Sequence, residues 1–267
     1  MLINTVILFI NDLLPIFILL CLLQANNPKV FKSKRDITTL MIISVFGIII
    51  TFNYLPSISE LWSGTGIEVI KSLGLLTVYV CLVFNYSTLF KTQCLSIKQH
   101  YLIFLAVVIF IILNASIFTI FLDSYISSNE SIQHIVAGLV IGLGICLSFS
   151  FLIYFLLGWL KKKNYYLVTY SFWSLFLTGQ VSKIINLLQQ VDIIQSSQTL
   201  WESSNLVEDK SEYGHLLNTL FGYEAKPSLE FIIVYLGSLL ILSSYFFIHL
   251  RMKIKKLKDL EERNYGH

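Results

Sequence analysis

The sequence predicts an all-α integral membrane protein, a bundle of seven transmembrane helices arranged as an inverted 3+3 repeat plus a terminal helix. Three observations predict this class. Of the 267 residues, 55% are hydrophobic and 13% are charged, which is about half the charged fraction of a soluble domain. Apolar runs long enough to cross a hydrocarbon core of about 30 Å recur along the chain. Positive charges gather in alternate connections, as they do in multi-pass proteins.

Seven apolar runs give the expected transmembrane spans, at 2–23, 38–55, 67–86, 101–121, 135–160, 165–186 and 230–250. The first run has no positive n-region and no small-residue cleavage site, so we expect a retained helix and not a signal peptide. The chain then divides into a six-helix core, an extracytoplasmic segment, a seventh helix and a basic cytoplasmic tail, at 1–186 (repeats 1–86 and 101–186), 187–229, 230–250 and 251–267.

The orientation follows from the distribution of Lys and Arg. Most of these 19 residues lie after the first, third and fifth spans and in the tail, whereas the connections 56–66 and 122–134 contain none. The positive-inside rule then places the N-terminus outside and the C-terminus in the cytoplasm. We expect the lipid bilayer to be the first partner of the chain. A missed helix would break this alternation, so the charges also support the helix count.

The segment 187–229 is the one long connection. It mixes acidic residues with apolar residues at helical spacing, and its aromatic residues argue against disorder. Long connections inside compact proteins are usually either functional or disordered. We therefore expect short amphipathic helices that lie on the outer face or fold back into the bundle.

The first and fourth spans resemble each other weakly. Residues 10–17 align with 113–120, and Asn11 and Asn114 are the only identity. Because three spans separate the two starts, the two helices enter the membrane from opposite sides. Inverted repeats of this kind are a common transporter plan, with the substrate site near the midplane between the repeats.

Asp12 lies in the middle of the first span, where an acid costs roughly 2.5–3.5 kcal/mol on insertion scales. An ionisable residue at such a depth normally faces a cavity or a partner. Pro15 removes a backbone donor and is expected to leave the carbonyl of Asn11 without its helical partner. A freed carbonyl beside a carboxylate favours a cation site. The alternative interpretation is a hydrogen-bonded aspartate that joins two helices.

Several other polar residues have a structural and a functional interpretation. Glu68 and Lys71 are three residues apart and are expected to form a rim salt bridge, with Lys71 snorkelling outward. Lys183 is expected to snorkel or pair, and its second interpretation is the counter-charge of Asp12. Asn114 is expected to donate an interhelical hydrogen bond.

Two further features are expected to be structural. Gly138 and Gly142 have the small-xxx-small spacing that lets helices approach closely, which predicts packing. His134 and His215 are expected at the surface and not as a metal pair. No nucleotide-binding, zinc-protease or nucleophile-elbow motif appears in the sequence, so an enzyme is not predicted.

The C-terminal half resembles the high-affinity iron permeases, which include the oxidase-dependent iron transporter and the bacterial iron-uptake permeases. The resemblance covers about residues 165–250 and is carried by Leu177-Thr178-Gly179-Gln180, Trp201-Glu202-Ser203-Ser204, Gly214 and Leu220-Phe221-Gly222-Tyr223-Glu224-Ala225-Lys226-Pro227-Ser228. It implies seven helices with the N-terminus outside, as the charges do. The family carries Arg-Glu-Gly-Leu-Glu in its first and fourth helices, and those glutamates are thought to bind iron in transit.

This chain departs from that pattern at both copies. The first copy aligns with Asn11-Asp12-Leu13-Leu14-Pro15 and keeps one acid, and the second aligns with Asn114-Ala115-Ser116-Ile117-Phe118 and keeps none. The resemblance implies a divergent permease that imports iron or a related cation across a bacterial cytoplasmic (inner) membrane, with Asp12 as the main ligand. The remaining expected metal-site residues are Asn11, Asn114, Ser116 and, as an outer access acid, Glu68.

The resemblance also implies the surroundings of that site. No permanently bound cofactor is expected, only the transported iron ion. A periplasmic iron-binding or oxidase partner is expected at the outer segment, and no nucleic acid is. The expected structural or access residues are Lys183, Trp201, Glu202, Gly222, Tyr223 and Glu224. The alternative function is a non-transporting membrane subunit that kept the permease scaffold and docks a periplasmic or membrane partner.

Overall fold

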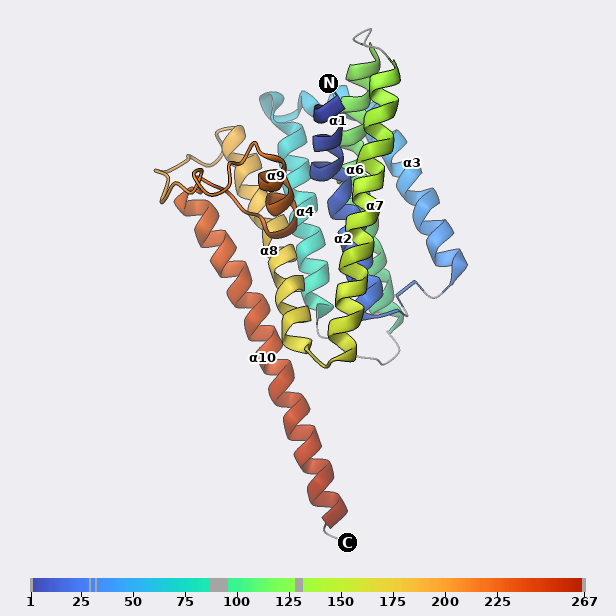
Figure 1. Cartoon of the computed structure of the whole chain (residues 1–267), viewed down its shortest axis with the longest axis vertical. Helices are drawn as coiled ribbons and strands as arrows, with labels where there is room; N and C mark the ends of the chain where they lie inside the picture. The colour runs from blue at the N-terminus through green and yellow to red at the C-terminus, as the bar shows by residue number, and fades with distance from the viewer. Residues whose placement is uncertain (1, 29, 32, 87–95, 128–131, 266–267) are drawn as a thin grey trace.

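The computed structural model describes residues 2–28, 30–31, 33–86, 96–127 and 132–265. This part of the chain is mainly helical, and its longest non-helical stretch is 191–211 (Figure 1). The elements in chain order are α1 (Leu2–Leu8), the π-helix η1 (Phe9–Leu13), α2 (Leu14–Asn26), α3 (Lys34–Ser59), the 3₁₀ turn η2 (Leu61–Gly64), α4 (Gly66–Phe84), α6 (Ile97–Ser127), α7 (Ile132–Lys162), α8 (Tyr166–Gln190), α9 (Glu212–Phe221) and α10 (Leu229–Tyr265).

Within the described residues, six helices are long and apolar enough to cross a membrane: Asn4–Asn26, Lys34–Ser59, Gly66–Phe84, Ile97–Tyr125, Ile135–Lys162 and Leu229–Ile248. The predicted class, an all-helical multi-pass membrane protein, is therefore confirmed. The expected span 165–186 falls in α8, a helix of 25 residues that is not among these six. Polar residues recur along one side of α8 and lower its hydropathy.

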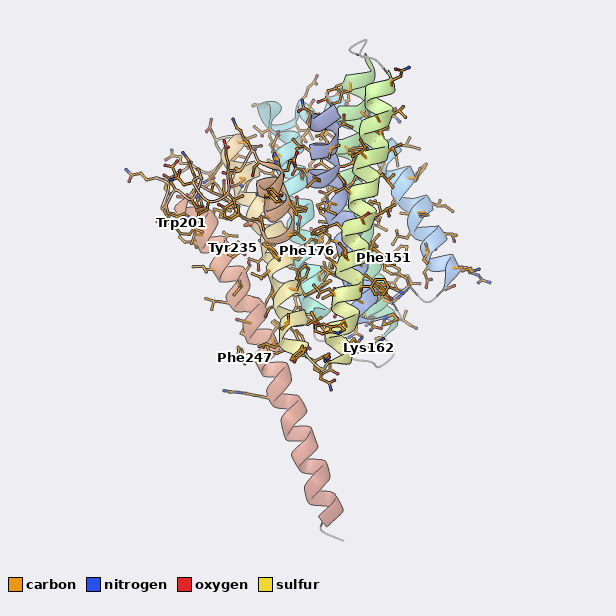
Figure 2. The ribbon with its side chains drawn as sticks, in the orientation of Figure 1. Phe151, Lys162, Phe176, Trp201, Tyr235 and Phe247 are labelled. Carbon is orange, nitrogen blue, oxygen red and sulfur yellow. The ribbon has the colours of Figure 1, made fainter. Side chains whose placement is uncertain are left out.

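The first helix, formed by α1, η1 and α2, lies inside the bundle, and α3 and α10 lie at its two edges (Figure 1). Leu14, Ile18 and Leu22 of the first helix are fully buried. The edge helices instead expose large apolar side chains, as lipid-facing helices do. Phe46 on α3 and Phe247 on α10 are each more than half exposed, and Figure 2 marks the position of Phe247.

Glycines on α7 let it approach the first helix closely. A Cβ atom added to Gly138 would lie 2.8 Å from the Cβ of Thr5, and one added to Gly142 would lie 2.5 Å from the ring of Phe9. Only glycine fits at such distances, so the predicted packing role of the Gly138 and Gly142 pair is confirmed.

The far end of the first helix is capped by a lysine from α7. The amino group of Lys161 donates hydrogen bonds to the carbonyl oxygens of Ala25 and Asn26, at 3.2 and 2.9 Å. The last carbonyls of a helix have no partner within it, and a cation near the C-terminus also interacts favourably with the helix dipole. Lys161 therefore fixes the end of α2 against α7.

The segment between α8 and α10 folds back onto the bundle. This is one of the two arrangements expected from the sequence, the other being a helix that lies on the outer face. Its helix α9 begins after Ser211, whose hydroxyl accepts a hydrogen bond from the backbone of Gly214 at 3.0 Å. It ends at Phe221 and is capped by Gly222, whose φ of 69° lies in the left-handed region that favours glycine. Thr219 and Leu220 are buried against α8 and η1.

The last apolar span ends close to where the sequence predicts, but its helix continues beyond it. The expected span 230–250 corresponds to Leu229–Ile248, whereas the helix α10 continues to Tyr265 and projects beyond the other helices (Figure 1). Residues 251–265 are therefore a continuation of the transmembrane helix. The charged residues there end the membrane-spanning part without ending the helix.

Candidate functional site

A π-turn places Asp12 and Asn11 at the site. In a π-helix each carbonyl pairs with the N–H five residues on, and Leu14 does donate to the carbonyl of Phe9. The equivalent partner of Ile10 would be Pro15, which has no N–H. From the sequence we expected Pro15 to free the carbonyl of Asn11. Because the helix makes a π-turn here, the freed carbonyl is that of Ile10, one residue earlier.

The freed carbonyl of Ile10 has a partner on α9. The hydroxyl of Thr219, which is completely buried, donates to it at 3.1 Å. α9 is also held from its other side, because the side-chain amide of Gln180 on α8 donates to the carbonyl of Thr219 at 3.1 Å. α9 therefore forms a wall between α8 and the π-turn.

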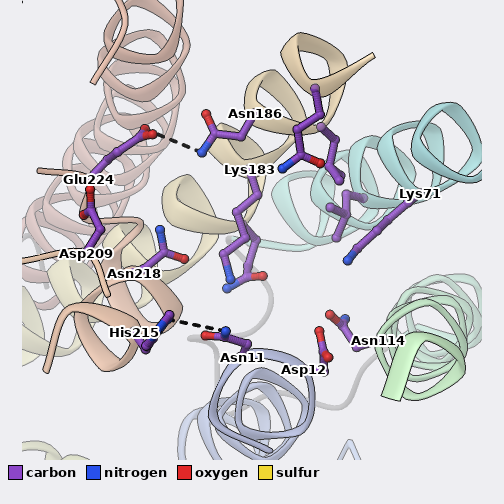
Figure 3. Close-up of a pocket in the computed structure, with 14 residues that line it drawn as sticks. Asn11, Asp12, Lys71, Asn114, Lys183, Asn186, Asp209, His215, Asn218 and Glu224 are labelled. Atoms are coloured by element: carbon purple, nitrogen blue, oxygen red, sulfur yellow. Dashed lines mark hydrogen bonds between the residues drawn. The ribbon is translucent and has the colours of Figure 1, made fainter. Parts of the chain in front are cut away.

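A polar cavity of about 420 Å³ lies beside this wall (Figure 3). Most of its lining residues carry amide or charged side chains. The amides are Asn11, Asn114, Gln180, Asn186, Gln190 and Asn218, and the charged residues are Asp12, Lys71, Lys183, Asp209 and Glu224. Leu75, Leu187 and His215 complete the lining. Soluble ligands typically occupy sites of about 300–1,000 Å³, so the space fits a small molecule.

Asp12 is 8% exposed and lies within electrostatic reach of Lys71 and Lys183. Among the described residues, these three side chains form no hydrogen bond and no ion pair within 4.0 Å. Charged groups in an apolar bundle are normally paired or face water or a ligand. The cavity therefore holds charges that are left available for a solute.

The wall formed by α9 and its flanking loops supplies polar groups from outside the membrane-spanning segments. The side-chain amide of Asn11 lies 3.5 Å from Nδ1 of His215, and that of Asn186 donates to Glu224 at 3.5 Å. Burial raises the pKa of the Glu224 carboxyl and lowers the pKa of His215. Asp209 accepts a hydrogen bond from the backbone of Ala225 at 2.7 Å, which fixes its position at the cavity.

An apolar layer lies one helical turn from the polar lining, on the side of the C-terminal ends of α2 and α4. On α6, Phe110 lies one turn below Asn114, and on α8, Phe176 lies one turn below Gln180. Both phenylalanines are at most 1% exposed. They surround a void of only about 10 Å³ together with Leu19, Val78 and Leu82. Dense apolar packing therefore closes the cavity toward the C-terminal ends of α2 and α4.

The structure brings some of the sequence-predicted residues to this cavity and leaves others away from it. Asn11, Asp12, Asn114, Lys183 and Glu224 line it. Lys183 lies near Asp12, in line with its second interpretation as a counter-charge.

Ser116 and Glu68 do not line the cavity. Ser116 lies two residues after Asn114 on α6, which turns it about 200° around the helix, and its hydroxyl lies 2.6 Å from that of Thr51. One carboxylate oxygen of Glu68 is buried without a hydrogen-bond partner among the described residues. The expected rim salt bridge with a snorkelling Lys71 is wrong, because Lys71 lines the cavity and no such ion pair occurs in the described chain.

The remaining motif residues have structural positions. Glu202 forms a surface ion pair with Lys226 at 2.6 Å, which lowers the pKa of Glu202 and raises the pKa of Lys226. The hydroxyl of Tyr223 lies 2.8 Å from that of Ser203. Trp201 lines a separate, mainly apolar groove beside Tyr235 (Figure 2).

Gly222 explains why the two motif segments occur together. A Cβ atom added to Gly222 would lie 2.5 Å from the Cα of Gly179, so the backbones of α8 and the end of α9 touch there. The motif around residues 177–180 and the motif around residues 220–228 are therefore the two sides of one contact.

Sequence reasoning missed much of the cavity. The polar residues of α8 carried a signal, because Gln180, Lys183, Asn186 and Gln190 are spaced by three or four residues and share one face. His215 was expected at the surface and instead lines the cavity.

Fold and site together define a multi-pass membrane protein with a polar, charge-lined cavity between its helices. Among the described residues, no group of three His, Cys, Asp or Glu side chains is placed to hold a metal ion. No family model, no curated protein and no solved structure matches the chain.

Proposed function

We propose that this chain is a membrane permease of the iron-permease kind and that the cavity around Asp12 is its solute site. The observation that carries the proposal is a cavity within the bundle whose charged lining residues have no ion-pair partner in the described part of the chain, and which apolar side chains close on one side. Ionisable residues in membrane helices commonly mark substrate or ion pathways. A solute site that is sealed toward one side of the membrane is what one state of an alternating-access transporter requires.

The proposed inverted repeat has support from two equivalent contacts. The alignment that pairs Asn11 with Asn114 also pairs Phe9 with Ile112. A Cβ atom added to Gly142 would meet the ring of Phe9 at 2.5 Å, and one added to Gly47 would meet Ile112 at 2.3 Å. The first helix thus packs on α7 as α6 packs on α3. The two contacts are therefore equivalent when the first repeat is exchanged with the second.

The proposal counts α8 as a membrane span in addition to the six long apolar helices, which gives seven spans in all. Its 25 residues extend about 37 Å at 1.5 Å per residue, enough for a hydrocarbon core of about 30 Å. It packs between α4 and α10, and its polar face lines the cavity. Polar residues on that face lower its hydropathy without meeting lipid. Seven spans then put the two ends of the chain on opposite sides, with the N-terminus outside.

The cargo is the part of the proposal that depends on the resemblance, which implies iron or a related cation. Asp12, Asp209 and Glu224 are the only acids that line the cavity in the described chain, and two lysines line it with them. A bare ferric ion prefers several oxygen donors at once. We therefore propose that a metal cargo enters this cavity with ligands of its own.

The test is uptake by cells that express the chain, with iron-55 offered as the ferrous ion and as ferric citrate. Asp12→Asn keeps the size of the side chain and removes its charge. Asp123→Asn is the matched control, because Asp123 is an exposed acid on α6 away from the cavity. Uptake that falls in the Asp12 variant alone supports the proposal. Uptake equal in both variants removes Asp12 from the mechanism.

The second candidate is a non-transporting membrane subunit that binds a partner through the segment between α8 and α10. The continuous apolar layer around Phe110 and Phe176 favours it. Purified protein in liposomes distinguishes the two, because a permease moves a solute without a partner. A chain that moves no solute and purifies only with another subunit would support the second candidate.

A further inference from the structure

The charges of the cavity are separated. Lys71 lies on one side together with Asp12 and Asn114, and Asp209 and Glu224 lie together on the other side, with Lys183 between them (Figure 3). Each side belongs to different elements, since Lys71 is on α4 and Asp209 and Glu224 flank α9. The cavity therefore has a basic side and an acidic side.

Lys183 lies within electrostatic reach of Lys71 and Asp12, so it counts toward the basic side, which then carries more positive than negative charge at the cavity surface. Asp12 offsets one of the two lysines, and Glu68 acts on Lys71 only from outside the lining. Neither lysine has an ion-pair partner among the described residues. An ammonium group in a site of low dielectric constant is stabilised by a carboxylate or another anion. This side is therefore arranged for a negative group.

The acidic side has the opposite requirement. Asp209 and Glu224 already accept hydrogen bonds, from the backbone of Ala225 and from Asn186. Each carboxylate has further lone pairs and no ion-pair partner among the described residues. Two neighbouring carboxylates attract a positive group.

We infer that the cavity binds an aminocarboxylate, with its carboxylate between Lys71 and Lys183 and its ammonium group toward Asp209 and Glu224. The six amides of the lining suit the polar body of such a solute. A diamine would bring a positive group against the lysines, and a dicarboxylate would bring a negative group against the acids. The inference rests on the proposed function in that both concern the same site.

Two sources offer this chemistry, a free amino acid and an aminocarboxylate that chelates a metal ion. Both present amine and carboxylate groups, and a volume of about 420 Å³ accommodates either. A chelate would supply the metal ligands that the described residues do not group together.

The experiment measures equilibrium binding of three probes of equal chain length to the purified full-length protein. The probes are 5-aminopentanoate, 1,5-diaminopentane and glutarate, the zwitterion, dication and dianion of one five-carbon skeleton. The inference predicts that 5-aminopentanoate binds at least tenfold more tightly than the other two. Equal or tighter binding of the diamine or glutarate, or no binding of any probe, would overturn it. Iminodiacetate with and without ferrous ion then separates a free solute from a chelate.

Charge variants test the orientation of the solute. Lys71→Gln keeps a polar side chain and is expected to weaken 5-aminopentanoate binding at least tenfold and to shift the preference toward 1,5-diaminopentane. Lys162→Gln is the matched control, because Lys162 is exposed at the other end of the bundle (Figure 2). If Lys71→Gln abolishes the binding of every probe, with no change in the preference among them, the variant has a folding defect. Lys183→Gln then repeats the test. An unchanged preference in both variants would overturn the inference.

The outcomes for the two proposals are distinguishable. Binding of 5-aminopentanoate without uptake into liposomes would refute the permease and leave the inference intact. Uptake of iron-55 that depends on Asp12, by a protein that binds no aminocarboxylate, would refute the inference alone.

Discussion

Replacing Thr219 with valine removes the one hydroxyl that bonds the freed carbonyl of Ile10 and keeps the shape of the side chain. Thr219 is completely buried, so water cannot replace the lost donor. A buried acceptor left without a partner costs about 1–3 kcal/mol. We expect Thr219→Val to lower the free energy of unfolding by that amount, measured by reversible unfolding in mixed micelles.

Thr119→Val is the matched control. The hydroxyl of Thr119 donates to the carbonyl of Ala115 at 2.8 Å, four residues earlier on α6, a carbonyl that already has its helical partner. We expect this control to remain within about 0.5 kcal/mol of the parent protein.

A double-mutant cycle with Pro15→Ala tests the cause. Alanine at position 15 restores an N–H that can pair with the Ile10 carbonyl, so Thr219→Val should then cost less. The expected interaction energy is about 0.5–3 kcal/mol. The reasoning is refuted if Thr219→Val costs no more than Thr119→Val, or if its cost is the same with and without Pro15.

Three further predictions concern packing, capping and pH. Gly142→Ala should cost about 1–3 kcal/mol through overpacking, whereas Gly144→Ala, with nothing within 4 Å of its added Cβ, should be neutral or stabilising in the same unfolding assay. Lys161→Met should cost about 1.5–3 kcal/mol through its lost bonds to the end of α2, and Lys162→Met should cost little. Burial raises the pKa of Glu224, so at a pH between the ordinary and the raised value the folded chain holds a proton there that the unfolded chain releases. Its contribution to stability is full below the ordinary glutamate pKa and falls as the pH rises through the raised value; unfolding of Glu224→Gln across pH should lack this fall.

The class of fold could be predicted because the bilayer imposes it on the sequence. Apolar runs of sufficient length and one-sided charges both follow from the cost of polar groups in lipid. The 187–229 segment could also be predicted to contain an amphipathic helix, since the residues around Leu220 repeat at helical spacing. The sequence left open whether this segment lies on the surface or folds back. The folded-back arrangement includes a hydrogen bond from Thr219 to the carbonyl of Ile10. That carbonyl is free because of a π-turn, which no sequence pattern predicts.

The site could be predicted only in part. Asp12 stood out because of its depth, and Asn114 because of the repeat. The expected interhelical hydrogen bond of Asn114 is wrong, because its amide donates to the carbonyl of Phe110 on its own helix at 2.9 Å. Lys71 was assigned to the rim because each helix was considered alone, whereas its position is decided by the cavity between helices. His215 has no sequence signal for its contact with Asn11, since 204 residues separate the two.

The most direct measurement of the central claim is the accessibility of the cavity to a membrane-impermeant, positively charged thiol reagent. The four native cysteines are replaced, and single cysteines are introduced as Asn114→Cys in the lining and Phe110→Cys one turn deeper. The account predicts that the reagent labels the Asn114 variant from the side of the N-terminus and leaves the Phe110 variant unlabelled from both sides. Equal labelling of the two, or no labelling of the Asn114 variant from either side, would contradict a polar cavity that is open at one end and sealed at the other.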